Sequence, residues 1–374
     1  MLHRNFRLLP RTVCLNLCLF AGMMWGIMGC TDKSKPTLLV YSDLDRRVVD
    51  PLVQQFQKEQ QMDVQVKYAE PKTVQSGEGL SSKIREEGSD AQVDAYWAND
   101  QEAIWNLQND GLLYSIGNES TVQVADKFRE PKSFWVSIGA RVRVLLYNKK
   151  LVNSKQIPQS LASLSQEMWK GRCGIADPRT NSSSRFHFLY LLAILKEREV
   201  TRLLEKIKGN AVQLLPDENA VVEAVASGKL AWGVVDSDLA KAAMKAKKPV
   251  AFVIADQVTH STADAMGLSH SSTPTVGTPV LLSPFTVFKT APHRPGAKIL
   301  HDFLLSQNIS KRWAELQPDR LPTQNTLLEH ELDQSNKRDG TFIDILSVNT
   351  LEVSQETLIS LRPQLLLLLK QIFP

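Results

Sequence analysis

Short apolar strands alternate with amphipathic helices along most of the chain, starting at residue 37. Residues 37–41 form an apolar run of the kind found in strands covered on both faces, and residues 49–56 then place apolar side chains at helical spacing. The same alternation returns in four further segments: 62–68, 81–87, 93–97 and 101–109. It predicts an open α/β sheet.

After a long β-prone stretch over 134–147, the alternation restarts. The second round predicts strands over 174–176, 212–215, 230–235 and 250–254, and helices over 184–196, 219–226 and 238–245. Two β runs (280–282 and 285–288) then lead into helices over 295–305, 309–316 and 361–373. Two α/β units without a long low-complexity linker between them favour two lobes with a cleft.

The first 29 residues have the composition of an export signal. Arg4, Arg7 and Arg11 precede an apolar run over 13–28, which is shorter than the roughly 20 residues that span a bilayer. An aliphatic residue, an apolar residue and glycine then precede Cys30, as in a bacterial lipobox. We expect a lipoprotein signal peptide over 1–29, lipid on Cys30 and a tether over 30–36; a cleaved soluble protein and an uncleaved anchor are the alternatives.

The charge balance argues against broad electrostatic binding. Lys and Arg number 44 against 40 Asp and Glu, and removal of the leader leaves 41 against 40. A nearly neutral mature chain does not support binding to nucleic acid. Cys14 and Cys18 leave with the leader and Cys30 would be acylated, so Cys173 has no partner and no disulfide framework is expected.

Acidic side chains follow several predicted strands, at the edge where open α/β sheets bind ligands. They are Asp43, Asp45, Asp100, Asp236 and Asp238. Carboxylates in this number suit a hard metal ion or an ammonium group. Since each also stands before a predicted helix, helix capping, worth about 1 kcal/mol, is the alternative for each residue alone.

A second group of residues has the opposite polarity. Residues 180–184 place hydroxyls and backbone N–H groups at a helix start, which favours an anion. Arg141 and Arg143 share one face of a strand with Tyr147, and their guanidinium groups could bind the same anion. The alternative is a solvent-facing strand from which both arginines extend into water. An anion cradle beside an acidic cluster suggests a metal with a co-bound anion, or a zwitterion.

Enzyme motifs are absent from the sequence. There is no G-x-S-x-G turn, H-E-x-x-H pair, P-loop or glycine-rich dinucleotide turn, and no histidine stands in a recognisable triad. We therefore expect no enzyme and no resident cofactor.

Five stretches together resemble the ferric-iron-type extracellular solute-binding proteins of bacterial ABC importers: 39–42, 135–148, 169–178, 219–228 and 297–306. The resemblance implies a type II periplasmic-binding-protein fold, in which two open α/β sheets are joined by a two-strand hinge and close around a ligand. We expect lobe 1 over 37–140 and 277–325, and lobe 2 over 141–276. The remaining segment, 326–374, is expected to be helical and to pack on the lobes.

The resemblance also implies where the ligand binds. The family's first-strand loop corresponds here to Ser42, Asp43 and Asp45, and its metal-binding glutamate to Asn99 or Asp100. Its anion-binding positions correspond to Arg141, Thr180, Asn181, Ser182 and Ser183. Tyr147 corresponds to a tyrosine close to the site in some members. Ferric-binding members carry adjacent tyrosines where this chain has Asp236 and Asp238. Asp45, Asp100 and Asp238 are therefore the expected metal ligands. Separately, loop 257–279 is long enough to cover the cleft.

The implied function is that of a monomeric, lipid-anchored receptor in the cell envelope. It would capture iron(III) or another metal with a synergistic anion, close, and deliver this cargo to ABC permease and ATPase subunits. An organic cation, a zwitterionic phosphonate or an organic acid is the alternative cargo. A sensory receptor and a secreted enzyme on the same scaffold are the alternatives of other classes.

Overall fold

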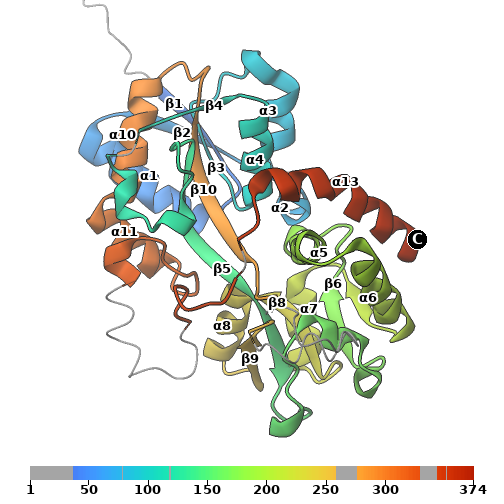
Figure 1. The fold of residues 1–374 in the computed structure, drawn as a ribbon. Coiled ribbons are helices and arrows are strands. Elements are labelled where there is room, and N and C mark those ends of the chain that lie inside the picture. Colours follow the sequence, from blue (N-terminus) through green and yellow to red (C-terminus); the bar gives the residue numbers. More distant parts are fainter. Residues whose placement is uncertain (1–36, 78, 118, 258–275, 329–342, 351) are drawn as a thin grey trace, which may run out of the picture. The chain divides into compact units, whose positions relative to one another are not determined.

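Ten strands of the described residues form one mixed sheet with helices around it (Figure 1). The structure, a computed structural model, describes residues 37–77, 79–117, 119–257, 276–328, 343–350 and 352–374. The sheet order is β2-β1-β3-β10-β5-β8-β6-β7, with β4 paired to β10 and β9 to β5. The predicted signal peptide, Cys30, the tether and most of loop 257–279 lie outside the described residues.

One end of the sheet, the first half, consists of β1 (Thr37–Ser42), β2 (Asp63–Tyr68), β3 (Ala95–Trp97), β4 (Leu113–Tyr114) and β10 (Val280–Phe288). Its helices are α1 (Arg46–Gln60), α2 (Pro71–Ser76), α3 (Ser81–Glu87), α4 (Gln101–Asn109), α10 (Arg294–Leu305) and α11 (Gln307–Leu316). Helix α1 begins where Asp45 accepts from the N–H of Arg47, and it buries Leu52 and Phe56. The two β runs predicted over 280–288 are one strand, with an irregularity between Leu282 and Pro284.

The other end, the second half, consists of β6 (Cys173–Ala176), β7 (Gln213–Leu215), β8 (Trp232–Asp236) and β9 (Val250–Ile254). Its helices are α5 (Ser182–Ile194), α6 (Glu197–Gly209), α7 (Glu218–Ala226) and α8 (Ser237–Lys245). Helix α6 was not among the predicted elements, although Val200, Leu203 and Ile207 give it a buried face at helical spacing.

Strand β5 (Trp135–Asn148) belongs to both halves. Residues 135–142 pair with β10, whereas residues 143–148 pair with β8 and β9. The change of partner falls between Val142 and Arg143. In Figure 1 the two strands β5 and β10 run side by side between the upper and lower groups of elements. This arrangement agrees with the predicted connection of the two halves by two strands. The exact lobe boundaries, 37–140 with 277–325 and 141–276, stay a prediction.

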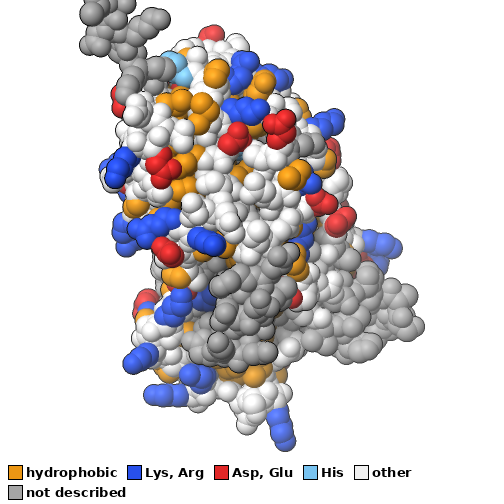
Figure 2. All heavy atoms as spheres, turned by 90° about the vertical axis from the view of Figure 1, so that its left-hand side faces the viewer, with side chains coloured by type: hydrophobic (Ala, Val, Ile, Leu, Met, Phe, Trp, Pro, Cys, Tyr) orange, Lys and Arg blue, Asp and Glu red, His pale blue; other side chains and the backbone are white. Residues whose placement is uncertain are grey.

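The last helix, α13 (Gln355–Ile372), lies against both halves. It packs on α5 and α6 of the second half and on α4 of the first, where Arg362 Nε lies 3.2 Å from Glu102 Oε2 (Figure 1). Among the described residues, no helix combines the length and the hydropathy that a membrane span requires. On the face in Figure 2, basic and acidic side chains are interspersed over the upper part, whereas basic ones prevail at the bottom.

Candidate functional site

Polar side chains from both halves of the sheet converge on one small cavity of about 170 Å³. The described residues that line it are Val74, Gln75, Asn99, Arg141, Asn181, Ser182, Ser183, Asp217, Glu218, Asn219, Asp236, Asp238, Leu239 and Arg320. They come from α2, the segment after β3 and the turn after α11 in the first half, from β5, and from the end of β8 and the starts of α5, α7 and α8 in the second half. We call this the cargo cavity, after the cargo that the sequence leads us to expect.

A buried ion-pair network forms one wall of the cargo cavity. Arg141 Nε donates to Asp236 Oδ2 at 2.7 Å, and Arg143 Nη1 donates to Asp236 Oδ1 at 2.5 Å. Arg143 also donates to Glu218, and Ser183 Oγ donates to Asp236 Oδ2 at 2.8 Å. Arg141 and Arg143 are 2% and 0% exposed, so the solvent-facing alternative for these arginines is wrong.

The two carboxyl groups of the network have pKa values shifted in opposite directions. Burial alone would raise the pKa of Asp236, but the charges of Arg143 and Arg141 outweigh it and lower the pKa to about 2. Burial raises the pKa of Glu218 to about 7, because Arg143 offsets its desolvation only in part. Asp236 is therefore an anion at neutral pH whose two oxygens are already occupied by cations and a hydroxyl.

A third arginine, Arg320, enters the cavity from the turn after α11. Its Nε lies 3.0 Å from Asp238 Oδ2, and its terminal nitrogens donate to Ser283 Oγ at 2.7 Å and to Asn99 Oδ1 at 2.9 Å. The Arg320 and Asp238 side chains are only 13% and 17% exposed. Because Asp238 lies on α8, this ion pair joins the two halves across the cavity.

The start of α5 supplies the neutral donors. Asn181 caps the helix by accepting from the N–H of Ser184 at 2.9 Å, and Ser182 and Ser183 are buried in the first turn. The first backbone N–H groups of a helix lack partners within the helix and carry a partial positive charge. Together with Arg141 and Arg320, this helix start makes the cavity suitable for an anion.

The structure brings seven of the predicted ligand-binding residues to the cargo cavity: Asn99, Arg141, Asn181, Ser182, Ser183, Asp236 and Asp238. The other six have different contacts. Thr180 is exposed in the turn before α5 and donates to the Asp177 carbonyl, while Tyr147 pairs with Trp232 in the second half. Ser42 is buried and donates to the Trp97 carbonyl at 3.3 Å.

Asp45 and Asp100 act as helix caps, as the alternative reading of the sequence expected. Asp45 accepts from the N–H of Arg47 and pairs with its guanidinium, and Asp100 Oδ1 accepts from the N–H of Glu102 at 2.8 Å. The third predicted metal ligand, Asp238, is paired with Arg320. Over the described residues, no group of three or more His, Cys, Asp or Glu could hold a metal ion, so the expected metal trio is not assembled.

Asp43, the last of the six, anchors a loop instead of lining the cavity. It accepts from the hydroxyl of Tyr96 and from the N–H of Leu80, the latter at 3.2 Å. Desolvation raises the pKa of Asp43 to about 6, which the hydrogen bonds from Tyr96 and Leu80 offset only in part.

Several lining residues were not predicted. Asp217, Glu218 and Asn219 follow β7 directly, so the rule that ligands bind after strands, applied to that strand as well, would have found them. Arg320 follows a helix and a turn rather than a strand, and only the tertiary contacts bring it to the cavity.

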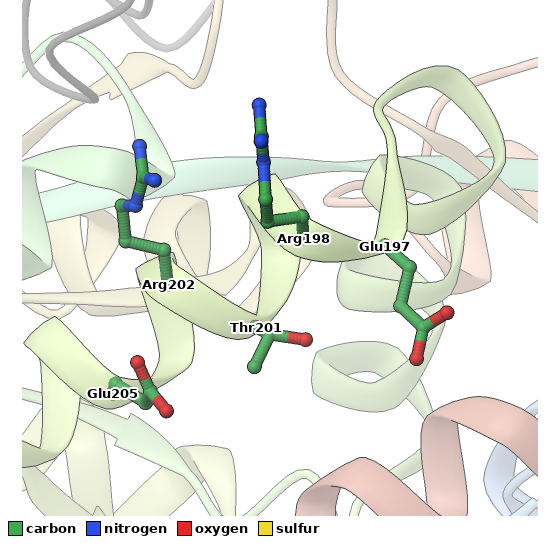
Figure 3. Close-up of a pocket in the computed structure, with 5 residues that line it drawn as sticks. All are labelled: Glu197, Arg198, Thr201, Arg202 and Glu205. Carbon is green, nitrogen blue, oxygen red and sulfur yellow. The ribbon is translucent and has the colours of Figure 1, made fainter.

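Two other hollows offer less to a charged cargo. One, of about 610 Å³, is lined largely by apolar and aromatic residues, and there Arg129 pairs with Asp126 and Lys127 donates to the Ile345 carbonyl. The other lies along α6 (Figure 3). Its described lining is Glu197, Arg198, Thr201, Arg202 and Glu205, all on one helix, and the arginines extend away from the glutamates.

Comparison with known proteins identifies the family of the chain. The model of the family described as bacterial extracellular solute-binding protein matches residues 98–344. Iron uptake protein A1 of Synechocystis is 25% identical over 232 residues, which cover 61% of this chain and 61% of that relative. The Fe(3+)-binding periplasmic protein of Serratia marcescens is 27% identical over 158 residues, 42% of this chain and 45% of the relative.

Solved structures show the same fold. Iron-bound HitA from Pseudomonas aeruginosa superposes with a TM-score of 0.71 at 19% identity, over 90% of this chain and 99% of that one. A Trichodesmium protein in complex with iron and citrate gives a TM-score of 0.69 at 19% identity, over 90% of this chain and 99% of that one. At such identities the likeness concerns the fold alone, and it confirms the predicted two-lobed, type II periplasmic-binding-protein fold.

The matching family and relatives are solute-binding proteins, which agrees with the expectation that the chain is not an enzyme. The family model extends from the end of β3 to beyond α11, so it includes nearly every segment that lines the cargo cavity. The chain therefore belongs to the bacterial extracellular solute-binding proteins.

Proposed function

We propose that the protein is a lipid-anchored receptor of an ABC importer, which captures iron(III) or another metal as a complex with a small anion. The observation that carries this proposal is the meeting of Arg141, Arg320 and the start of α5 in one cavity. The relatives named for iron uptake and Fe(3+) binding support the same cargo class.

The donor set favours binding through the anion. Asp236 is saturated by two arginines and a serine, and Asp238 is paired with Arg320, so neither carboxylate is free for a metal in this structure. A chelating anion can supply the metal's oxygen ligands itself while its outer oxygens accept from guanidinium groups. A volume of about 170 Å³ lies below the roughly 300–1,000 Å³ of drug-sized pockets and favours a small cargo.

The test is a binding panel on the purified protein, read by calorimetry and thermal shift. Ferric citrate or ferric carbonate at 100 times its Kd should stabilise the fold by about 2.7 kcal/mol. Arg320→Ala should weaken that binding about 10- to 100-fold, because a charge-assisted hydrogen bond is worth about 1.5–3 kcal/mol. Arg47→Ala removes an exposed arginine outside the cavity and serves as the control.

A second variant separates the two kinds of cargo. Asp238→Ala frees Arg320, so an anionic ferric complex should bind at least as tightly as to the wild type. Loss of ferric binding in Asp238→Ala would instead make Asp238 a metal ligand. The competing cargo, an organic cation or zwitterion, is suggested by the carboxylates Asp217, Glu218 and Asp238 in the same cavity. It predicts a response to amines or phosphonates that Asp238→Ala weakens, with no response to iron.

Anchoring and delivery form the remainder of the proposal. The lipobox-like sequence before Cys30 supports lipid attachment and a place in the cell envelope. Cys30→Ala should move the protein from the membrane fraction to the soluble fraction, and retention in the membrane would contradict lipidation. Co-purification with a permease and an ATPase supports import, whereas capture of a sensor kinase alone would favour a sensory receptor.

A further inference from the structure

Helix α2 of the first half lines part of the cargo cavity and contacts α5 of the second half. Val74 and Gln75 of α2 line the cavity. The helix ends at Gly77, which has a positive φ of 77°. A Cβ at Gly77 would lie only 2.7 Å from the Cβ of Ser182, so the end of α2 packs directly against the first turn of α5.

Arg185 of α5 joins the two helices. Its Nη2 donates to the carbonyl oxygen of Ser76 at 2.6 Å, and Arg185 is only 3% exposed although it does not line the cargo cavity. The carbonyls at the end of a helix lack partners within the helix and carry partial negative charge, which favours a cation there.

Asp100 adds to the negative potential at this junction. The position that a Gly77 Cβ would take lies 3.1 Å from both Arg185 Nη2 and Asp100 Oδ2. Asp100 is 5% exposed, and its Oδ2 has no hydrogen-bond partner among the described residues. The guanidinium of Arg185 therefore comes from the second half toward a carbonyl and a carboxylate of the first.

The residues that follow α2, Gly79 and Leu80, are fixed within the first half. A Cβ at Gly79 would lie 2.3 Å from Asp43 Oδ2, so only glycine fits above that carboxylate. Asp43 also accepts from the N–H of Leu80 at 3.2 Å and from Tyr96. Because Asp43 holds Gly79 and Leu80 within the first half, the C-terminal end of α2 lies between this anchor and α5 of the second half.

We propose that Arg185 is a positioning residue that latches α2 over the cargo cavity when the two halves close. The inference rests on the proposed receptor function, because closure is what retains a cargo. Arg185 holds the cavity shut through Ser76 without contacting the cargo itself. Its loss should therefore open α2 and speed cargo release while leaving the lining residues outside α2 in place.

A matched control exists on the surface. Lys245 of α8 pairs with Asp319 of the first half at 2.7 Å, so it also links the halves, but its side chain is 46% exposed. Exposed pairs of this kind contribute little. Lys245→Ala therefore removes a contact between the halves without removing the buried latch.

The experiment is hydrogen exchange of the full-length protein without ligand, followed by calorimetric titration with ferric citrate. In Arg185→Ala, amides of residues 72–77 should exchange at least tenfold faster, and the Kd for ferric citrate should rise at least tenfold. Lys245→Ala should change neither more than about twofold. Arg185→Lys keeps the positive charge but loses the planar guanidinium group with its N–H donors, and it should give intermediate values.

Gly77→Ala tests the same latch from the other side. Its Cβ pushes α2 away from Ser182 and should reproduce the faster exchange even if Arg185→Ala folds poorly. Unchanged exchange in residues 72–77 of both variants would overturn the latch, and so would faster exchange with an unaltered ferric citrate Kd. If the wild type binds no ferric citrate, the proposed cargo fails, and the ligand-free exchange data decide the latch alone.

Discussion

Two aspartates at corresponding places in the two halves have opposite electrostatics. Asp43 follows β1 and Asp236 ends β8, and both strands have parallel neighbours. The pKa of Asp236 is lowered to about 2, whereas that of Asp43 is raised to about 6.

The difference lies in the partners. Asp236 has two arginines within hydrogen-bond distance, but Asp43 has a tyrosine hydroxyl and a backbone N–H, which do not compensate for lost hydration as a full positive charge does. The same residue type, at the same kind of strand end, is a permanent anion in one half and a titratable group in the other.

The largest expected effect comes from removing the cation that Asp236 shares with Glu218. Arg143→Ala leaves two buried carboxylates with Arg141 as the remaining neighbouring cation, and breaking a buried ion pair costs about 3–5 kcal/mol of unfolding free energy. Urea unfolding at pH 7 measures this, with Arg47→Ala expected within about 0.5 kcal/mol of the wild type. A loss below about 1 kcal/mol would mean that the network does not set the charge of Asp236.

A smaller effect of opposite sign is expected at Asp43. Because its folded pKa of about 6 exceeds the ordinary value of 3.8, the folded state binds the proton more tightly, and ionisation of Asp43 costs stability as pH rises from about 4 to 6. Asp43→Asn removes this cost, and since Asp43 is only partly buried we expect a gain of about 2 kcal/mol at pH 7.

The measurement is the difference in unfolding free energy between Asp43→Asn and the wild type from pH 4 to pH 8. The difference should grow with pH through the window between about 4 and 6 and stay constant above it. A constant difference across the whole range would show that Asp43 does not titrate there, and the contrast with Asp236 would disappear.

The smallest effect is expected at Asp45, which the sequence placed among the metal ligands. Asp45→Ala removes the cap of α1 and should cost about 1 kcal/mol of unfolding free energy, while the Kd for ferric citrate stays within about twofold. Thermal unfolding and calorimetry on the same preparation check both values. A tenfold weaker ferric citrate complex would return Asp45 to the binding site.

Much of the fold was predictable because it depends on local periodicity. The spacing of apolar residues in α1 and the β-prone run of β5 are properties of short segments, and the structure has both nearly where the sequence placed them. The prediction missed α2 because six residues are too few to show a period. It placed the start of α5 at Ser184, two residues late, although Asn181 is a strong N-cap.

The site was predictable only in part, since the strand-end rule names an edge of a sheet and not the direction of a side chain. It found Ser183 and Asp236, which meet in the cargo cavity. Arg141 lies inside a strand, and the prediction came from the strand face that it shares with Arg143. The strand-end rule could not separate the residues that it found from Asp45 and Asp100, which also follow strands but whose carboxylates accept from helix N–H groups.

The sequence by itself determined the alternation of strands and helices, the family resemblance and the absence of the tyrosine pair, because each is a property of neighbouring residues in the chain. Only the tertiary structure decided which charges pair. Arg141 and Asp236 are 95 residues apart, and Arg320 reaches Asp238 and Asn99 from a different part of the chain. Ion-pair energies and pKa values depend on distances of a few ångströms and on burial, and folding alone sets both.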